Sequence, residues 1–68
     1  MGRNYTELHK KIRSKYLRMS SFASDLGITV GTLSSKLKGI TDWKRDEIEK
    51  VAELLDLTTE EVISYFFN

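Results

Sequence analysis

Few residues in this sequence have the types and spacing that catalysis or metal binding requires. His9 is the only histidine and cysteine is absent, so the chain can build neither a histidine-pair metal site nor a cysteine–histidine dyad. The adjacent acids Asp46 and Glu47, like Glu60 and Glu61, have the chemistry of a general acid–base pair. Each pair falls in the expected first turn of a helix, however, where the helix dipole favours negative charge. We therefore expect a protein that is not an enzyme and that uses no metal, cofactor or small-molecule substrate.

The charged residues point instead to a polyanion or a protein as the partner. Residues 1–45 carry ten lysines and arginines against three acids, a net charge of +7. Residues 46–68 carry one lysine against seven acids, a net charge of −6, and the overall charge of +1 conceals this division. A basic front suits a nucleic acid, and an acidic back suits solvent or a basic protein.

Length and composition bound the setting of the protein. A chain of 68 residues is too short for two hydrophobic cores, so we expect residues 1–68 to form a single domain. The absence of cysteine suits a reducing cytoplasm. No apolar run approaches the ~18 residues that span a membrane, and the first five residues lack the apolar segment of a secretory signal. We expect a cytoplasmic protein with no membrane partner.

Helical spacing of apolar residues, with no proline and no sustained alternation, predicts an all-α fold. Ser20 or Ser21 is expected to cap the second helix and Thr29 the third, while Gly27 and Gly39 end these helices where a left-handed backbone is needed. A capping box from Thr58 to Glu61 opens the last helix. The predicted helices cover residues 6–17, 21–26, 30–38, 44–55 and 59–66.

The residues between the second and third of these helices favour a helix-turn-helix centred on residues 22–37. Such a pair needs a small residue where its helices cross, which Ala23 supplies, and a tight turn with positive φ, which Gly27 supplies. It also needs apolar residues that lock the two helices together, which are Phe22, Leu26, Ile28 and Leu33.

On these residues the chain resembles the Cro/CI-like (Xre) family of phage and bacterial regulators. The stretch FASDLGITVGTLSSKLKG, residues 22–39, looks like that family's motif. Residues 43–48 and 52–55 look like its fourth helix, and the ending at residues 65–67 resembles that of small phage members. The resemblance implies a compact five-helix, lambda-repressor-like domain. One departure is Lys36, because the family usually places an apolar residue there, and we expect Leu37 to take over the packing.

The resemblance implies that the start of the third helix enters the major groove of operator DNA in a lysis/lysogeny switch of a phage in its bacterial host. Carried over by position, the residues that face the bases are Thr29, Val30, Gly31, Ser34 and Ser35. Those that contact phosphates are Ser21, Lys36, Lys38, Lys44 and Arg45.

A second hypothesis is that the chain binds a repressor protein. The expected reading face has no Arg, Asn or Gln, the side chains that make bidentate base contacts. The chain is also similar in size and layout to the modulator-of-repression proteins of lactococcal temperate phages, which implies an antirepressor that covers the DNA-binding domain of a CI-type repressor. The residues expected at such a protein interface are Val30, Gly31, Lys36, Ile63 and Phe67.

The aromatic ending is richer in apolar residues than one short helix can bury. We expect Phe66 to join the core with Val62, and Ile63 or Phe67 to face a second copy of the chain in a homodimer.

Overall fold

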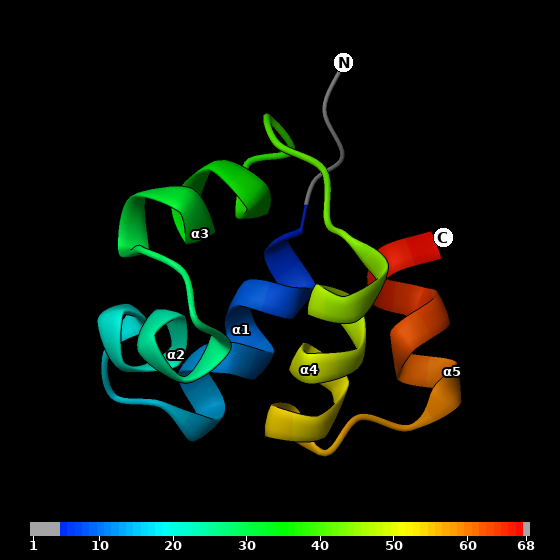
Figure 1. Ribbon diagram of the computed structural model, residues 1–68. Coiled ribbons are helices and arrows are strands. Elements are labelled where there is room, and N and C mark those ends of the chain that lie inside the picture. Colours follow the sequence, from blue (N-terminus) through cyan, green and yellow to red (C-terminus); the bar gives the residue numbers. More distant parts are fainter. Residues whose placement is uncertain (1–4, 68) are drawn as a thin grey trace.

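The computed structural model describes residues 5–67, which form five α-helices followed by a π-helical turn (Figure 1). No strand occurs in this part of the chain. The bounds are α1 Thr6–Lys15, α2 Met19–Leu26, α3 Val30–Leu37, α4 Arg45–Leu55, α5 Thr59–Val62 and the π-helical turn η1 Ile63–Phe67. The predicted all-α fold with five helices is therefore confirmed.

Helix α1 ends at Lys15, two residues before the predicted end. Tyr16 has an extended backbone with φ −122° and ψ 132°, and its hydroxyl donates a hydrogen bond of 2.8 Å to Asp25 of α2. That hydrogen bond, together with burial and the charge of Asp25, raises the pKa of the Tyr16 phenol. The contact ties the end of α1 to α2 and directs the chain away from the α1 axis.

Helix α2 begins at Met19, so the prediction that Ser20 or Ser21 caps it is wrong. Arg18 occupies the N-cap position with an extended backbone, and no side chain caps this helix. The predicted end is confirmed: Gly27 has φ 86°, and its N–H donates to the carbonyls of Ala23 and Ser24. The turn from Gly27 to Thr29 then leads directly into α3.

Local capping signals fix the starts of α3 and α5. The Thr29 hydroxyl accepts a hydrogen bond of 3.1 Å from the Thr32 N–H, which confirms the predicted cap of α3. At α5 the Thr58 hydroxyl accepts from the Glu61 N–H at 3.1 Å, and the Glu61 carboxylate accepts from the Thr58 N–H at 3.0 Å. Both halves of the predicted capping box are therefore present.

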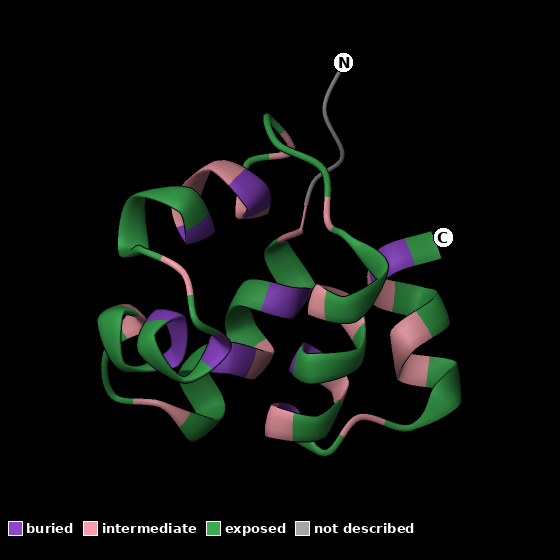
Figure 2. Cartoon of the chain, viewed as in Figure 1, coloured by how far each residue is buried: buried purple, intermediate pink, exposed green. Residues whose placement is uncertain are grey.

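The core draws on every helix except the short α5. Figure 2 shows the buried positions facing the middle of the helix assembly, with exposed positions outside. The buried apolar residues are Leu8, Ile12, Phe22, Ala23, Leu26, Leu33, Val51, Leu55 and Phe66. Burying a side chain the size of leucine or phenylalanine stabilises the folded state by roughly 1.5–3 kcal/mol. The large buried side chains of α2 and α3 therefore hold these two helices in place.

An aromatic cluster joins the residue before α1, the connection before α4 and η1. The Trp43 ring lies edge-on to Phe66 at 5.3 Å between centroids, and Tyr5 lies 6.2 Å from Trp43 and 6.1 Å from Phe66. The expectation that Phe66 belongs to the core is confirmed, with Val62 packed against it. No helix among residues 5–67 is long and apolar enough to cross a membrane.

Candidate interaction surface on α1 and α3

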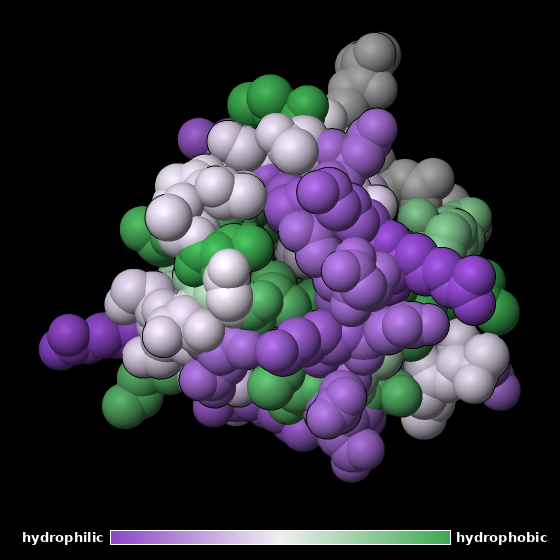
Figure 3. Space-filling model, in the orientation of Figure 1, coloured by the Kyte–Doolittle hydropathy of each residue, from purple (hydrophilic) through white to green (hydrophobic). Residues whose placement is uncertain are grey.

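The exposed start of α3 is the part of the molecule with the features of a recognition surface. Val30 keeps half of its side-chain surface exposed, and Gly31 and Thr32 are exposed beside it. In the space-filling view the surface over α3 has intermediate to apolar hydropathy, whereas a hydrophilic band covers α4 (Figure 3). The first turn of α3 thus presents small, uncharged groups.

The hydroxyls of this turn are largely engaged with one another. Thr29 Oγ1 donates to Thr32 Oγ1 at 2.9 Å while it accepts from the Thr32 N–H. Thr29 therefore acts first as a cap. Thr32 was absent from the predicted site, although its capping spacing from Thr29 was visible in the sequence.

Ser34 and Ser35 lie less openly than the prediction requires, since both are half-buried. Ser34 lines a groove between α3 and α1. The Ser35 carbonyl accepts hydrogen bonds from the N–H groups of Ile40 and Thr41, at 3.0 and 3.3 Å, where the chain leaves α3. Of the five residues predicted to face bases, only Val30 and Gly31 are both exposed and free of a capping role.

The groove that Ser34 lines has a volume of about 400 Å³. Its buried and half-buried lining residues, which form its floor, are apolar apart from Ser34, and its exposed lining residues include Thr6, His9 and Lys38. Its lining residues are Tyr5, Thr6, His9, Met19, Val30, Leu33, Ser34, Leu37 and Lys38. His9, which the predicted site did not include, is exposed and borders this groove. The spacing of Thr6 and His9 on one helical face was the available signal.

Lys36 is buried, which corrects two expectations drawn from the sequence. Only 3% of the residue is exposed, so its ammonium group is not available to DNA phosphates or to a protein interface in this structure. Leu37 does pack against the core, as expected, but it is only half-buried and does not replace Lys36, which itself occupies the inward position.

The ammonium group of Lys36 is fully partnered inside the protein. Nζ donates to Glu47 Oε1 at 2.8 Å and to the Asp42 carbonyl at 2.8 Å, and lies 5.7 Å from the centre of the Trp43 ring. Burial acts to raise the pKa of Glu47, but hydrogen bonds from Lys36 and the Lys44 N–H and the charges of both lysines lower it overall. A buried cation with such partners holds the chain that joins α3 to α4.

The other residues predicted to contact phosphates are exposed but spread over three elements. Ser21 lies in α2, Lys38 follows α3, and Lys44 and Arg45 lie at the start of α4. Arg45 pairs with Glu49 at 3.5 Å on the exposed face of α4. Lys38 alone among them borders the groove.

The predicted protein-interface residues divide into two places. Val30 and Gly31 belong to the start of α3, whereas Ile63 and Phe67 belong to η1, where 53% and 64% of their surfaces are exposed. Neither Ile63 nor Phe67 lines the groove. No group of three or more histidine and acidic side chains within residues 5–67 is arranged to hold a metal ion.

A family model described as "Protein of unknown function (DUF739)" matches residues 1–68. The chain belongs to the DUF739 family. A search of curated proteins gave no match.

This DUF739 protein is similar to a phage protein of known structure. It is the solution structure of the modulator of repression of the temperate bacteriophage TP901-1 from Lactococcus lactis. The two chains are 37% identical, the match covers 100% of this chain and 92% of the phage protein, and the TM-score is 0.79. The resemblance to modulators of repression is therefore supported over the whole length, while membership of the Cro/CI-like family stays a prediction.

Proposed function

We propose that this DUF739 protein regulates the genetic switch of a temperate phage by binding a CI-type repressor and keeping that repressor from its operator. The full-length similarity to a phage modulator of repression supports a role in phage regulation. The role requires no reaction and no cofactor, and it would be carried out in the bacterial cytoplasm, where the repressor meets phage DNA.

The observation that carries this proposal is the chemistry of the exposed face of α3. Val30 presents an apolar side chain and Gly31 presents bare backbone, and this face has no Arg, Asn or Gln. Bidentate contacts from those side chains supply about 1–3 kcal/mol of discrimination each between bases. With Lys36 withdrawn into the core as well, this face is better suited to packing against a protein than to reading base edges.

Direct operator binding is the second candidate, and the charge of the chain favours it. Residues 1–45 carry a net charge of +7, and Lys38, Lys44 and Arg45 are exposed. In this alternative α2 and α3 act as a DNA-binding helix-turn-helix, with these cations on phosphates and Val30 against a thymine methyl.

A titration separates the two functions. Labelled switch-region DNA is titrated with this protein alone, and a preformed repressor–DNA complex is titrated in parallel, each at low and physiological salt. We expect no sequence-selective binding by the protein alone and release of DNA from the complex. Salt-steep, sequence-selective binding of the protein alone, with an undisturbed repressor complex, would establish the DNA reader instead.

A variant sharpens this test. Replacing Ser35 by alanine removes a side-chain hydroxyl of the predicted reading set from a residue of α3 that does not line the groove. An antirepressor should keep its activity after this change, whereas a base reader should lose selectivity.

A further inference from the structure

The groove between α1 and α3 is built to receive apolar groups. Tyr5, Met19, Leu33 and Leu37 are half-buried or buried members of the core or its margin, and each also lines the groove. Val30 stands at the opening with half of its surface exposed. A hollow of about 400 Å³ lies within the range of ~300–1,000 Å³ typical of binding pockets, so it has room for large side chains of a partner.

The edge of the groove is cationic. Lys38 lines it from the end of α3. Arg13 does not line the groove, but it is exposed one helical turn after His9 on the same face of α1. No aspartate or glutamate is among the lining residues. The one acid in α1, Glu7, pairs with Lys10 at 3.3 Å.

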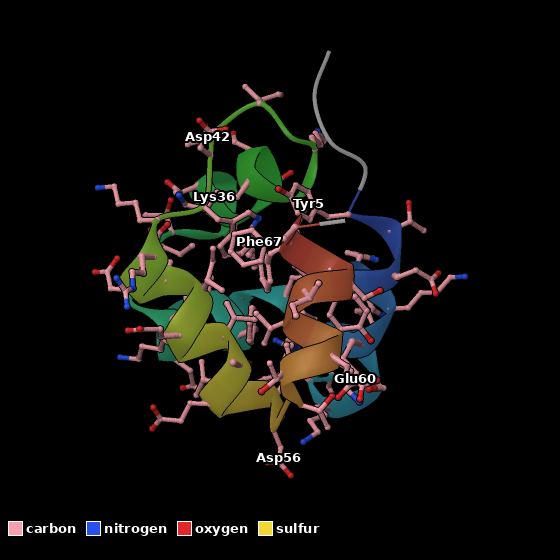
Figure 4. The ribbon with its side chains drawn as sticks, turned by 90° about the vertical axis from the view of Figure 1, so that its right-hand side faces the viewer. Tyr5, Lys36, Asp42, Asp56, Glu60 and Phe67 are labelled. Atoms are coloured by element: carbon pink, nitrogen blue, oxygen red, sulfur yellow. The ribbon has the colours of Figure 1, made fainter. Side chains whose placement is uncertain are left out.

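The acids of the molecule are concentrated elsewhere. Asp46, Glu49 and Glu53 are exposed on α4, and Asp56 and Glu60 follow it. In Figure 4, Asp56 and Glu60 lie toward one end of the molecule, while Tyr5 and Lys36 lie toward the other, together with the single acid Asp42 among the residues labelled there. The groove therefore has an apolar floor and a positive edge without carboxylates of its own to neutralise it.

We infer that this groove is the docking site for an acidic amphipathic helix of a protein partner. Large apolar side chains on one face of that helix enter the groove, and its flanking carboxylates meet Lys38 and Arg13. The inference rests on the proposed function in taking the repressor as the protein that carries the helix. A DNA backbone would satisfy the cations but would leave the apolar floor without a matching group.

Binding of a defined peptide to the full chain tests the groove separately from the repressor. The probe is a synthetic peptide about 15 residues long, with leucines at helical spacing on one face and glutamates on the others, followed by NMR. We expect shifts at His9, Leu33, Ser34 and Leu37. A peptide with lysines in place of the glutamates should bind more weakly by about tenfold or more.

Matched variants of the protein place the contact. Val30→Asp and Lys38→Glu should weaken peptide binding by about tenfold or more, whereas Ile40→Asp and Lys50→Glu make the same chemical changes outside the groove and should alter it by less than about twofold. Equal affinity for the lysine peptide, or shifts confined to α4 and α5, would overturn the inference. Shifts that depend on protein concentration without peptide would identify a second copy as occupant. Shifts produced by duplex DNA and not by the peptide would identify a nucleic-acid surface.

The same variants in the repressor–operator assay keep the two proposals apart. Both proposals are supported if the parent protein and the control variants release the repressor from DNA while Val30→Asp and Lys38→Glu do not. Release that is equal for parent, Val30→Asp and Lys38→Glu overturns the groove inference alone. Peptide binding in the groove with an undisturbed repressor complex overturns the proposed function alone.

Discussion

Lys36 Nζ lies 2.8 Å from Glu47 Oε1, a contact that joins the last turn of α3 to the first turn of α4. Only 3% of the lysine side chain and 16% of the glutamate side chain are exposed. Glu47 also accepts a hydrogen bond of 2.8 Å from the Lys44 N–H, so one carboxylate both pairs with the buried cation and caps α4. The orientation of α3, which carries the proposed partner surface, thus depends on a residue of the acidic half of the chain.

The first prediction concerns this buried pair. Glu47→Ala should lower the free energy of unfolding by about 3 kcal/mol, because the Lys36 ammonium is left buried without its counter-charge. Chemical denaturation with urea, followed by far-UV circular dichroism, measures the change. Replacing Lys36 and Glu47 together by leucine is the control and should leave stability within about 1 kcal/mol of the parent, since burial of both charges is then avoided. A loss below about 1 kcal/mol for Glu47→Ala would contradict this account.

The second prediction is a loss of stability in acid. The folded-state pKa of Glu47 lies below the usual 4.5, and that of Glu61 is lowered chiefly by the hydrogen bond from the Thr58 N–H and also by Lys11. A carboxyl whose pKa is lower in the folded protein than in the unfolded chain stabilises the fold fully above its unfolded-state pKa. That stability is lost as the pH falls through its folded-state pKa. The free energy of unfolding should therefore decline below about pH 4.5.

Urea denaturation at several pH values tests this, with Glu47→Gln as the comparison. The variant cannot titrate at position 47, so its stability should be lower near neutral pH and should change less on acidification. Parallel curves for the parent and Glu47→Gln would show that this carboxylate is not a source of the acid sensitivity.

The third prediction is that replacement by alanine destabilises the protein at Gly27 and stabilises it at Gly31. Gly27 has φ 86°, and a Cβ there would meet no atom within 4 Å. Gly27→Ala should therefore lower the free energy of unfolding by about 1–2 kcal/mol through backbone strain alone. Gly31 is helical, and a Cβ would lie 4.0 Å from Thr29 Oγ1. Gly31→Ala should therefore raise the free energy of unfolding by about 0.5–1 kcal/mol. Thermal unfolding of the two variants checks both, and a shift of the melting temperature in the same direction for both would refute the assignment.

The fourth prediction is self-association through η1. Phe67 exposes 64% of its surface beside Ile63, and we expect this apolar face to pair with a second copy of the chain. Light scattering should give a mass above the 7.9 kDa of one chain, and Phe67→Ser should lower that mass. Leu17→Ser alters a more exposed apolar residue, at 93%, outside η1 and should leave the mass unchanged. A parent protein that already has the mass of one chain would remove the idea.

Features governed by near neighbours in the sequence were predictable. The caps at Thr29 and Thr58 depend on residues three positions away, and the end of α2 depends on the permissive backbone of Gly27. The start of α2 was predicted too late, because the extended backbone already ends at Arg18 and the helix begins there without a side-chain cap. The early end of α1 likewise depends on Tyr16 reaching Asp25 in another helix.

The site was less predictable because it depends on contacts between distant residues. The exposure of Val30 and Gly31 follows from their place at the start of α3. The burial of Lys36 requires Glu47, eleven positions along the chain, to be brought beside it by the turn after α3. The groove exists only because α1 packs near α3, and no local pattern specifies that distance.

The wide turn of η1 makes the C-terminal segment tolerant of a change in chain length. A π-helical turn holds one more residue than an α-helical turn, so removing Ser64 would allow α5 to continue as a regular helix. The residues after the deletion would then stay close to their present places, with Phe66 facing inward and Phe67 exposed. The packing of Phe66 against Trp43 should therefore survive such a deletion.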